Sequence, residues 1–300
     1  MKAPLLSPYR PSHWLAATLL VVASLVAGSA AAAPERIRLL LPPLSSPDQV
    51  YSRFQPLARY LSERVGIPVK PRVAGDLEAL LRMAGEDRPQ LAYLCPLIYS
   101  RLADTEGGLA PLVRIKRNGK STFRTVVVVR QGSPYEGLAE LKGARFAYGN
   151  PVCAASRLVP EAMFAEAGVE PGQDFFEKRT LGSNENALYS VAADLFDATA
   201  VDEASARPFL EKGVLRALQY SRPIPQYLLA ANSALSTELR RRLAKALTAL
   251  GRPDHNGVLD ALGPDVDGFV GTRDSDYDVI RSMRRTEGAP DPVAEDPEVP

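Results

Sequence analysis

The sequence predicts an α/β protein whose two lobes enclose a ligand cleft. Apolar segments of strand length alternate with amphipathic helices in two separate runs, one before residue 104 and one after residue 123. Most of the strands are apolar throughout, which is typical of parallel sheets covered by helices on both faces. Two long segments, near 123–127 and 224–228, are placed to carry the chain between the lobes and back. Ligands of such sheets bind beyond the carboxyl ends of the strands.

In the first run, predicted strands and helices alternate without exception. The helix at 48–66 places Val50, Phe54, Leu57, Leu61 and Val65 at helical spacing and ends at Gly66. Pro42 and Pro43 end the first strand. The predicted elements are strands at 36–42, 67–73 and 90–95, and helices at 48–66, 76–85 and from Pro96 onward.

The second run starts with the longest β-branched stretch, at 123–130. It continues with strands at 143–149, 197–202 and 224–232 and helices at 156–168, 184–194 and 236–251. From residue 286 the chain is rich in proline and acidic residues, which predicts a disordered tail. The expected division is lobe 1 from 34–125, lobe 2 from 126–226, completion of lobe 1 by 227–285, and a tail at 286–300.

The first 33 residues have the pattern of a signal peptide. Lys2 and Arg10 precede an apolar stretch at 14–28, and small residues at 29–33 allow cleavage after Ala33. A membrane anchor is the alternative, but the apolar stretch is short for a span. We therefore expect export to a bacterial periplasm.

The composition argues against two classes of function, nucleic-acid binding and metal binding. The net charge of +1 and the absence of a basic block argue against nucleic-acid binding. The only histidines are His13 and His255, and no spacing of His, Cys, Asp and Glu suggests a metal site. We expect neither a metal nor a cofactor.

The loop at 149–160, GNPVCAASRLVP, follows a strand and precedes a helix. A helix N-terminus favours anions and lowers the pKa of a nearby thiol, so Cys153 is expected to have thiolate character. Cys95 ends a strand of lobe 1 and would face the same cleft. The two cysteines either form a disulfide, flank one ligand atom, or remain separate buried thiols.

Nine stretches, in order, resemble the phosphate/phosphite/phosphonate family of periplasmic solute-binding proteins over residues 36–285. They include FQPLARYLSERVG, LAYLCPLIYSRLA, GLAELKGARFAYGNP, GSNENALYSV and GFVGTRDSDYDVIRSM. The resemblance implies a type II-like two-lobed fold and a monomer, not an enzyme. It also implies ligand capture by lobe closure and a partner at the inner membrane, either an ABC permease or a sensor histidine kinase.

The ligand loop departs from the family pattern. Where the family has Ser-Thr-Ser-Gly, this chain has Cys153, Ala154, Ala155 and Ser156; family tyrosines are replaced by Leu77 and Phe123, and a histidine by Asn184. Each lost partner of a buried oxyanion costs about 1–3 kcal/mol. The resemblance therefore supports the fold and a binding role more strongly than it supports phosphonate as the ligand.

The expected function is capture of a small oxyanion-like ligand. One alternative is a thiol-dependent arsenite-type sensor using Cys153, since some periplasmic sensors resembling this family bind arsenite through a cysteine. Others are an enzyme with Cys153 as nucleophile and an interaction module without a ligand. The candidate ligand-binding residues are Leu77, Cys95, Tyr99, Phe123, Cys153, Ala154, Ala155, Ser156, Asn184, Glu185 and Asp202.

Overall fold

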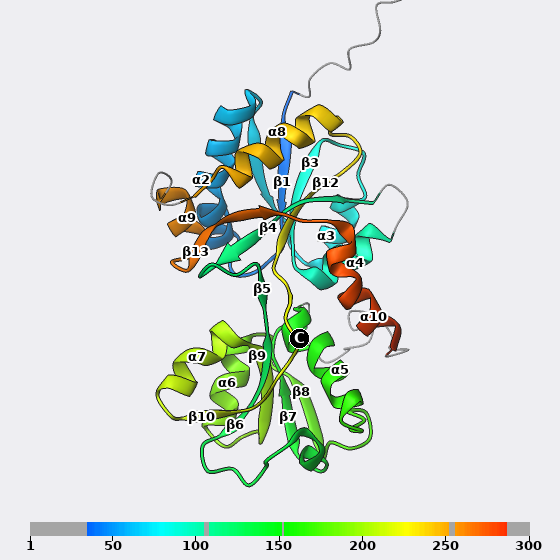
Figure 1. Cartoon of the computed structure of the whole chain (residues 1–300), viewed down its shortest axis with the longest axis vertical. Coiled ribbons are helices and arrows are strands. Elements are labelled where there is room, and N and C mark those ends of the chain that lie inside the picture. Colours follow the sequence, from blue (N-terminus) through cyan, green and yellow to red (C-terminus); the bar gives the residue numbers. More distant parts are fainter. Residues whose placement is uncertain (1–34, 105–107, 152, 252–255, 287–300) are drawn as a thin grey trace, which may run out of the picture. The chain divides into compact units, whose positions relative to one another are not determined.

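The structure is a computed structural model, and it describes residues 35–104, 108–151, 153–251 and 256–286 (Figure 1). The predicted signal peptide and nearly all of the predicted tail lie outside these residues. No helix within the described ranges is long and apolar enough to cross a membrane.

Lobe 1 is the part of the molecule built on a six-stranded sheet with the order β13-β4-β12-β3-β1-β2. Strand β1 is parallel to β2 and β3. Strand β12 is antiparallel to both of its neighbours, β3 and β4, and β13 is antiparallel to β4. The prediction of a parallel sheet is right for the first three strands and wrong for the whole sheet, because β12 returns from the other lobe in the opposite direction. The strands are β1 (Ile37–Leu41), β2 (Val69–Val73), β3 (Gln90–Leu94), β4 (Ala110–Arg117), β12 (Leu228–Ala231) and β13 (Val266–Gly271).

Helices cover both faces of this sheet. Successive side chains of a strand point to opposite faces. Accordingly, Leu39 and Leu41 belong to one buried cluster and Leu40 to another. The first face carries α2 (Pro47–Val65), α8 (Thr237–Thr248) and α9 (Asn256–Leu262); the second carries α3 (Leu77–Ala84) and α4 (Pro96–Ala103).

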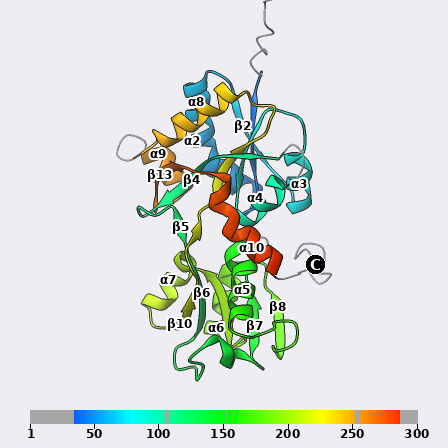
Figure 2. The same cartoon turned by 45° about the vertical axis from the view of Figure 1, so that its right-hand side comes forward.

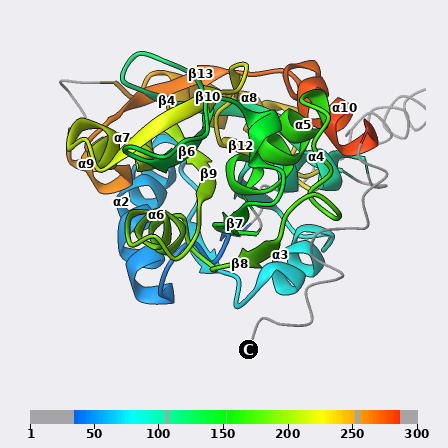
Figure 3. The same ribbon diagram turned by 90° about the horizontal axis from the view of Figure 1, so that it is seen from below.

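Lobe 2 is the part built on a five-stranded sheet with the order β10-β6-β9-β7-β8. Strands β7, β8 and β9 are parallel, and β6 runs antiparallel to both of its neighbours, β9 and β10. Helix α5 (Leu158–Glu166) covers one face, and α6 (Asn184–Ala192) and α7 (Glu203–Glu211) cover the other (Figure 3). The strands are β6 (Thr125–Arg130), β7 (Arg145–Tyr148), β8 (Glu177–Thr180), β9 (Ala198–Asp202) and β10 (Leu215–Tyr220).

Two short strands connect the lobes. β5 (Thr122–Phe123) and β11 (Ile224–Pro225) pair in antiparallel register, with Phe123 opposite Ile224. The predicted continuous strand at 224–232 is interrupted between β11 and β12, and Tyr227 lies in that interruption. These segments cross where the sequence predicts a crossing.

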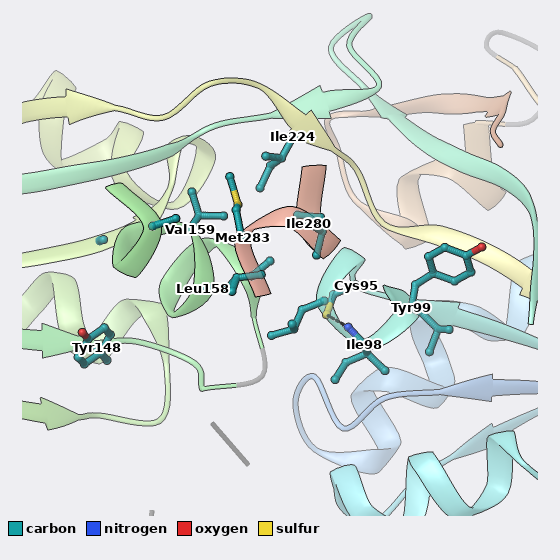
Figure 4. Close-up of a cluster of buried hydrophobic side chains, with 14 of the residues drawn as sticks. Cys95, Ile98, Tyr99, Tyr148, Leu158, Val159, Ile224, Ile280 and Met283 are labelled. Carbon is teal, nitrogen blue, oxygen red and sulfur yellow. Dashed lines mark hydrogen bonds between the residues drawn. The ribbon is translucent and has the colours of Figure 1, made fainter. Parts of the chain in front are cut away.

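A third connection was not predicted. Helix α10 (Asp278–Thr286) follows the short turn η3 (Asp274–Tyr277) and contacts both α4 of lobe 1 and α5 of lobe 2 (Figure 2). Ile280 and Met283 of α10 share one buried cluster with Leu158, Val159 and Ile98 (Figure 4). The apolar core is therefore continuous from one lobe to the other along this side.

Candidate functional site

The cleft between the lobes consists of two adjoining chambers of about 630 and 690 Å³. Both are lined by segments that directly follow β1, β7 and β8, and the apolar chamber also by the segment after β3. These are the carboxyl ends of parallel strands, as the sequence predicts. The polar chamber includes Arg53, Arg117 and Asp202 in its lining, and the apolar chamber includes Leu77 and Leu94. The two chambers have in common Pro43, Leu44, Asn150, Gly182 and Tyr227.

Asn184, at the start of α6, connects three residues of lobe 2 by hydrogen bonds where this lobe faces the cleft. Its Oδ1 accepts hydrogen bonds from the Asn150 amide at 3.1 Å and the Ser156 hydroxyl at 2.6 Å, and its Nδ2 donates to Asp202 at 3.1 Å. Residue 149 must be glycine, because a Cβ there would lie 2.5 Å from Asn184 Oδ1. One side chain thus ties the loop after β7 to the end of β9.

Asp202 is committed to a structural role. It is the N-cap of α7, where one carboxylate oxygen accepts from the Ser205 amide at 3.0 Å and the other from the Ser205 hydroxyl at 2.6 Å. The positive end of the helix compensates much of its negative charge.

In the loop after β7, backbone amides donate hydrogen bonds to carbonyl oxygens of the same loop. The Cys153 amide donates to Asn150, and the amides of Ser156 and Arg157 both donate to the Cys153 carbonyl. Three of the five amides from Cys153 to Arg157 therefore donate to carbonyl oxygens within the loop. The Ala154 amide lowers the pKa of Cys95, and the Ala155 amide lowers the pKa of Cys153, although burial outweighs both effects.

The prediction of thiolate character for Cys153 is wrong. A short 3₁₀ turn at Ala154–Ser156 follows Cys153, and α5 begins only at Leu158. Burial raises the pKa of Cys153, and the nearby Asp202 raises it further. Burial also raises the pKa of Cys95 to about 12. Both thiols are neutral and free of disulfides.

The thiols nevertheless lie near each other across the lobes. The pKa of Cys95 is raised in part by Cys153, and the pKa of Tyr227 is raised by burial and then by both cysteines. The Tyr227 hydroxyl donates to Cys153 Sγ over 3.9 Å. Cys95 Sγ in turn accepts from the Ile98 amide at 3.5 Å and caps α4.

The lobe 1 wall supplies positive charge. Arg117 at the end of β4 pairs with Asp265. Arg53 on α2 is exposed to the polar chamber, and among the described residues no carboxylate pairs with it. Between them lies Tyr93, whose pKa is raised by burial and lowered in part by the Arg117 guanidinium. The Tyr93 ring stacks on Tyr227 with centroids 5.4 Å apart.

The predicted site residues fall into three groups: those that line the polar chamber, those that line the apolar chamber and those that line neither. Phe123, Cys153, Asn184 and Asp202 line the polar chamber, and Leu77 and Cys95 line the apolar one. The lining of neither chamber includes Tyr99, Ala154, Ala155, Ser156 or Glu185.

These five residues lie elsewhere for separate reasons. Tyr99 is fully buried and donates to Asp274 at 2.6 Å, so its assignment to the cleft is wrong. Ala154 and Ala155 are also fully buried, and Ser156 faces Asn184 inside the lobe. Glu185 is an exposed first-turn residue of α6.

The sequence analysis missed Arg53, Arg117, Gln226 and Tyr227. The alternation of Val113 and Ile115 with basic residues predicts a half-buried strand ending at Arg117, and this signal was available. Arg53 is one of several arginines on the polar side of α2, and nothing in the helical period distinguishes it.

Two α/β lobes, two crossing strands and a cleft at the carboxyl ends of the parallel strands define a two-lobed periplasmic binding protein. The chain belongs to the family of periplasmic substrate-binding proteins of phosphonate ABC transporters, whose model matches residues 39–277. As expected from the sequence, this is a family of binding proteins and not of enzymes.

Solved structures show the same fold. PhnD1 from Prochlorococcus marinus in complex with methylphosphonate matches with a TM-score of 0.70 at 20% identity, over 85% of this chain and 99% of that one. A binding protein of a phosphonate ABC transporter from Pseudomonas aeruginosa matches with 0.69 at 20% identity, over 89% and 91%. A Xanthomonas citri protein bound to ATP matches with 0.71 at 19% identity, over 84% and 96%.

The role of Asn184 is testable. Asn184→Ala leaves the buried Ser156 hydroxyl and the Asn150 amide without their acceptor, which should lower the free energy of unfolding by about 1–3 kcal/mol. Urea unfolding measures this. Glu185→Ala, one residue away and exposed, should change it by less than about 0.5 kcal/mol. Equal effects of the two substitutions would contradict the assignment.

The state of the thiols can be measured by alkylation. Because burial raises the pKa of both thiols, iodoacetamide should label native Cys95 and Cys153 at pH 7.5 more slowly than in urea, by about a hundredfold or more for Cys95. The native rate should still rise with pH above 9, where the unfolded rate levels off. Rapid native labelling of Cys153 at neutral pH would restore the thiolate prediction and reopen the nucleophile hypothesis.

Proposed function

We propose that this protein captures a small organic anion in the cleft and that Arg53 is the residue that binds the anionic group. The single observation behind this proposal is the unmatched charge of Arg53 in the polar chamber. Asp265 neutralises Arg117, and helix α7 compensates Asp202. Arg53 is left to attract an anion, with Tyr93 and the remaining donors of Arg117 close by.

The loop after β7 is a poor anion site in this chain. Three of its amides donate to carbonyl oxygens of the loop itself, and the Ser156 hydroxyl donates to Asn184. The positions where the family has hydroxyl side chains hold Cys153, Ala154 and Ala155. Binding of an oxyanion there would require these contacts to break. The charge on the opposite wall makes lobe 1 the better source of ligand contacts.

Two related structures contain phosphorus oxyanions, methylphosphonate in one and ATP in the other. At identities of 19–20% they support the ligand's chemical class and no particular compound. A phosphonate or a similar oxyanion is consistent with the family and with Arg53.

Ligand capture would involve the crossing strands. Closure is a shift in population, so a ligand must contact both lobes to favour the closed state. The lobe boundaries predicted from the sequence, and a monomeric state, fit this proposal. The family implies an ABC permease as the partner; a sensor kinase is the alternative role.

A second candidate is a thiophilic ligand such as arsenite. It is favoured by the two free thiols that interact across the cleft. Their neutrality does not prevent it, because arsenite condenses with two thiols and releases two molecules of water. Phe123 and Tyr227 would border such a ligand on the polar side.

Substitution of Arg53 tests the main proposal. Arg53→Gln removes a charge-assisted contact worth about 1.5–3 kcal/mol, so affinity for the bound anion should fall about tenfold to a hundredfold. Wild type and variant are compared by thermal shift and calorimetry with phosphate, phosphite, methylphosphonate, 2-aminoethylphosphonate, arsenate and arsenite. The matched control is Arg59→Gln, on the exposed side of α2 away from the cleft, which should change affinity less than twofold.

Unchanged affinity in Arg53→Gln would refute the assignment of Arg53. Binding of arsenite alone, abolished by Cys153→Ser and retained in Arg53→Gln, would establish the thiol candidate instead.

A further inference from the structure

The apolar chamber offers a binding site for an apolar part of the ligand. It adjoins the polar chamber and contains Leu77, Leu80, Leu94 and Ile98 from lobe 1, with Pro151 and Leu181 from lobe 2. We propose that the ligand is an organic anion with an alkyl tail, whose anionic head binds at Arg53 and whose tail occupies this chamber. The inference rests on the proposed function and adds the class of ligand.

Three polar residues that line this chamber, Asp76, Asn150 and Cys95, make hydrogen bonds within the protein. The Asp76 carboxylate caps α3 by accepting from the Ala79 amide at 2.6 Å. The Asn150 amide donates to Asn184. Cys95 is a neutral thiol that accepts from Ile98. An apolar tail would therefore enter without breaking these hydrogen bonds, whereas a second anionic group would find no free donor among these three residues.

The dimensions agree with a ligand larger than a simple oxyanion. Pockets of about 300–1,000 Å³ hold drug-sized ligands, and each chamber falls within that range. A head group the size of methylphosphonate would leave the apolar chamber to water. Because Leu77 and Leu80 come from one lobe and Leu181 from the other, a tail between them would also favour lobe closure.

Two homologous series test the inference by calorimetry. The probes are the methyl- to n-butylphosphonates and the straight-chain carboxylates from acetate to hexanoate. Affinity should rise about three- to fourfold with each added methylene until the chamber is filled. The heat-capacity change of binding should become more negative along the same series.

A variant pair locates the tail. Leu77→Asn places an amide in the apolar chamber and should reduce the gain to less than about 1.5-fold per methylene. The matched control, Leu81→Asn, makes the same change on the same helix outside both chambers and should retain the wild-type gain. Thermal unfolding confirms that both variants fold; if Leu77→Asn does not, the wild-type series decides alone.

The outcomes separate this inference from the proposed function. If methylphosphonate or acetate binds and affinity is flat along its series, the tail is refuted and anion capture stands. If no member of either series binds, both proposals fail. A gain per methylene that persists in Leu77→Asn and disappears in Leu81→Asn would place the tail elsewhere.

Discussion

The hydrogen bonds of Asn184 are the constraint on which the ligand side of lobe 2 depends. The amide of this one residue satisfies the loop after β7 through Asn150 and Ser156 and the end of β9 through Asp202. The network turns the loop inward, and it requires glycine at residue 149. Ala154 and Ala155 are buried, and the Cys153 carbonyl accepts from the amides of Ser156 and Arg157, which are then not available to a ligand.

Under the proposed function, the anion binds on the opposite wall of the cleft, in lobe 1. The positive charge in the polar chamber comes from Arg53 and from Arg117, and Asp265 already neutralises Arg117. Cys153 lines the polar chamber and Cys95 the apolar one, and burial raises the pKa of both thiols. The fold of the family is retained while the chemistry of its cleft is divided between the two lobes.

Much of the fold could be predicted, because the apolar strands and amphipathic helices before residue 104 and after residue 123 have clear periods. The antiparallel joins of β12 and β13 could not, since the direction of a returning strand depends on the other lobe. C-terminal helices that complete lobe 1 by residue 285 were predicted, but the packing of α10 on α5 of lobe 2 was not, because the helical period does not say which lobe an apolar stripe faces. In the site, the sequence located the loop and Asn184, but not their internal pairing. Tyr99 and Tyr93 flank the same proline, and only the packing of α4 against η3 and α10 decides which one reaches the cleft.

A crystal structure of the mature protein with n-propylphosphonate would test the central claim most directly. The account predicts phosphonate oxygens within hydrogen-bonding distance of the Arg53 guanidinium, the propyl group against Leu77 and Leu181, and the Asn184 hydrogen bonds intact. Phosphonate oxygens on the amides of Ala154 to Ser156, with the Asn184 network broken, would contradict it.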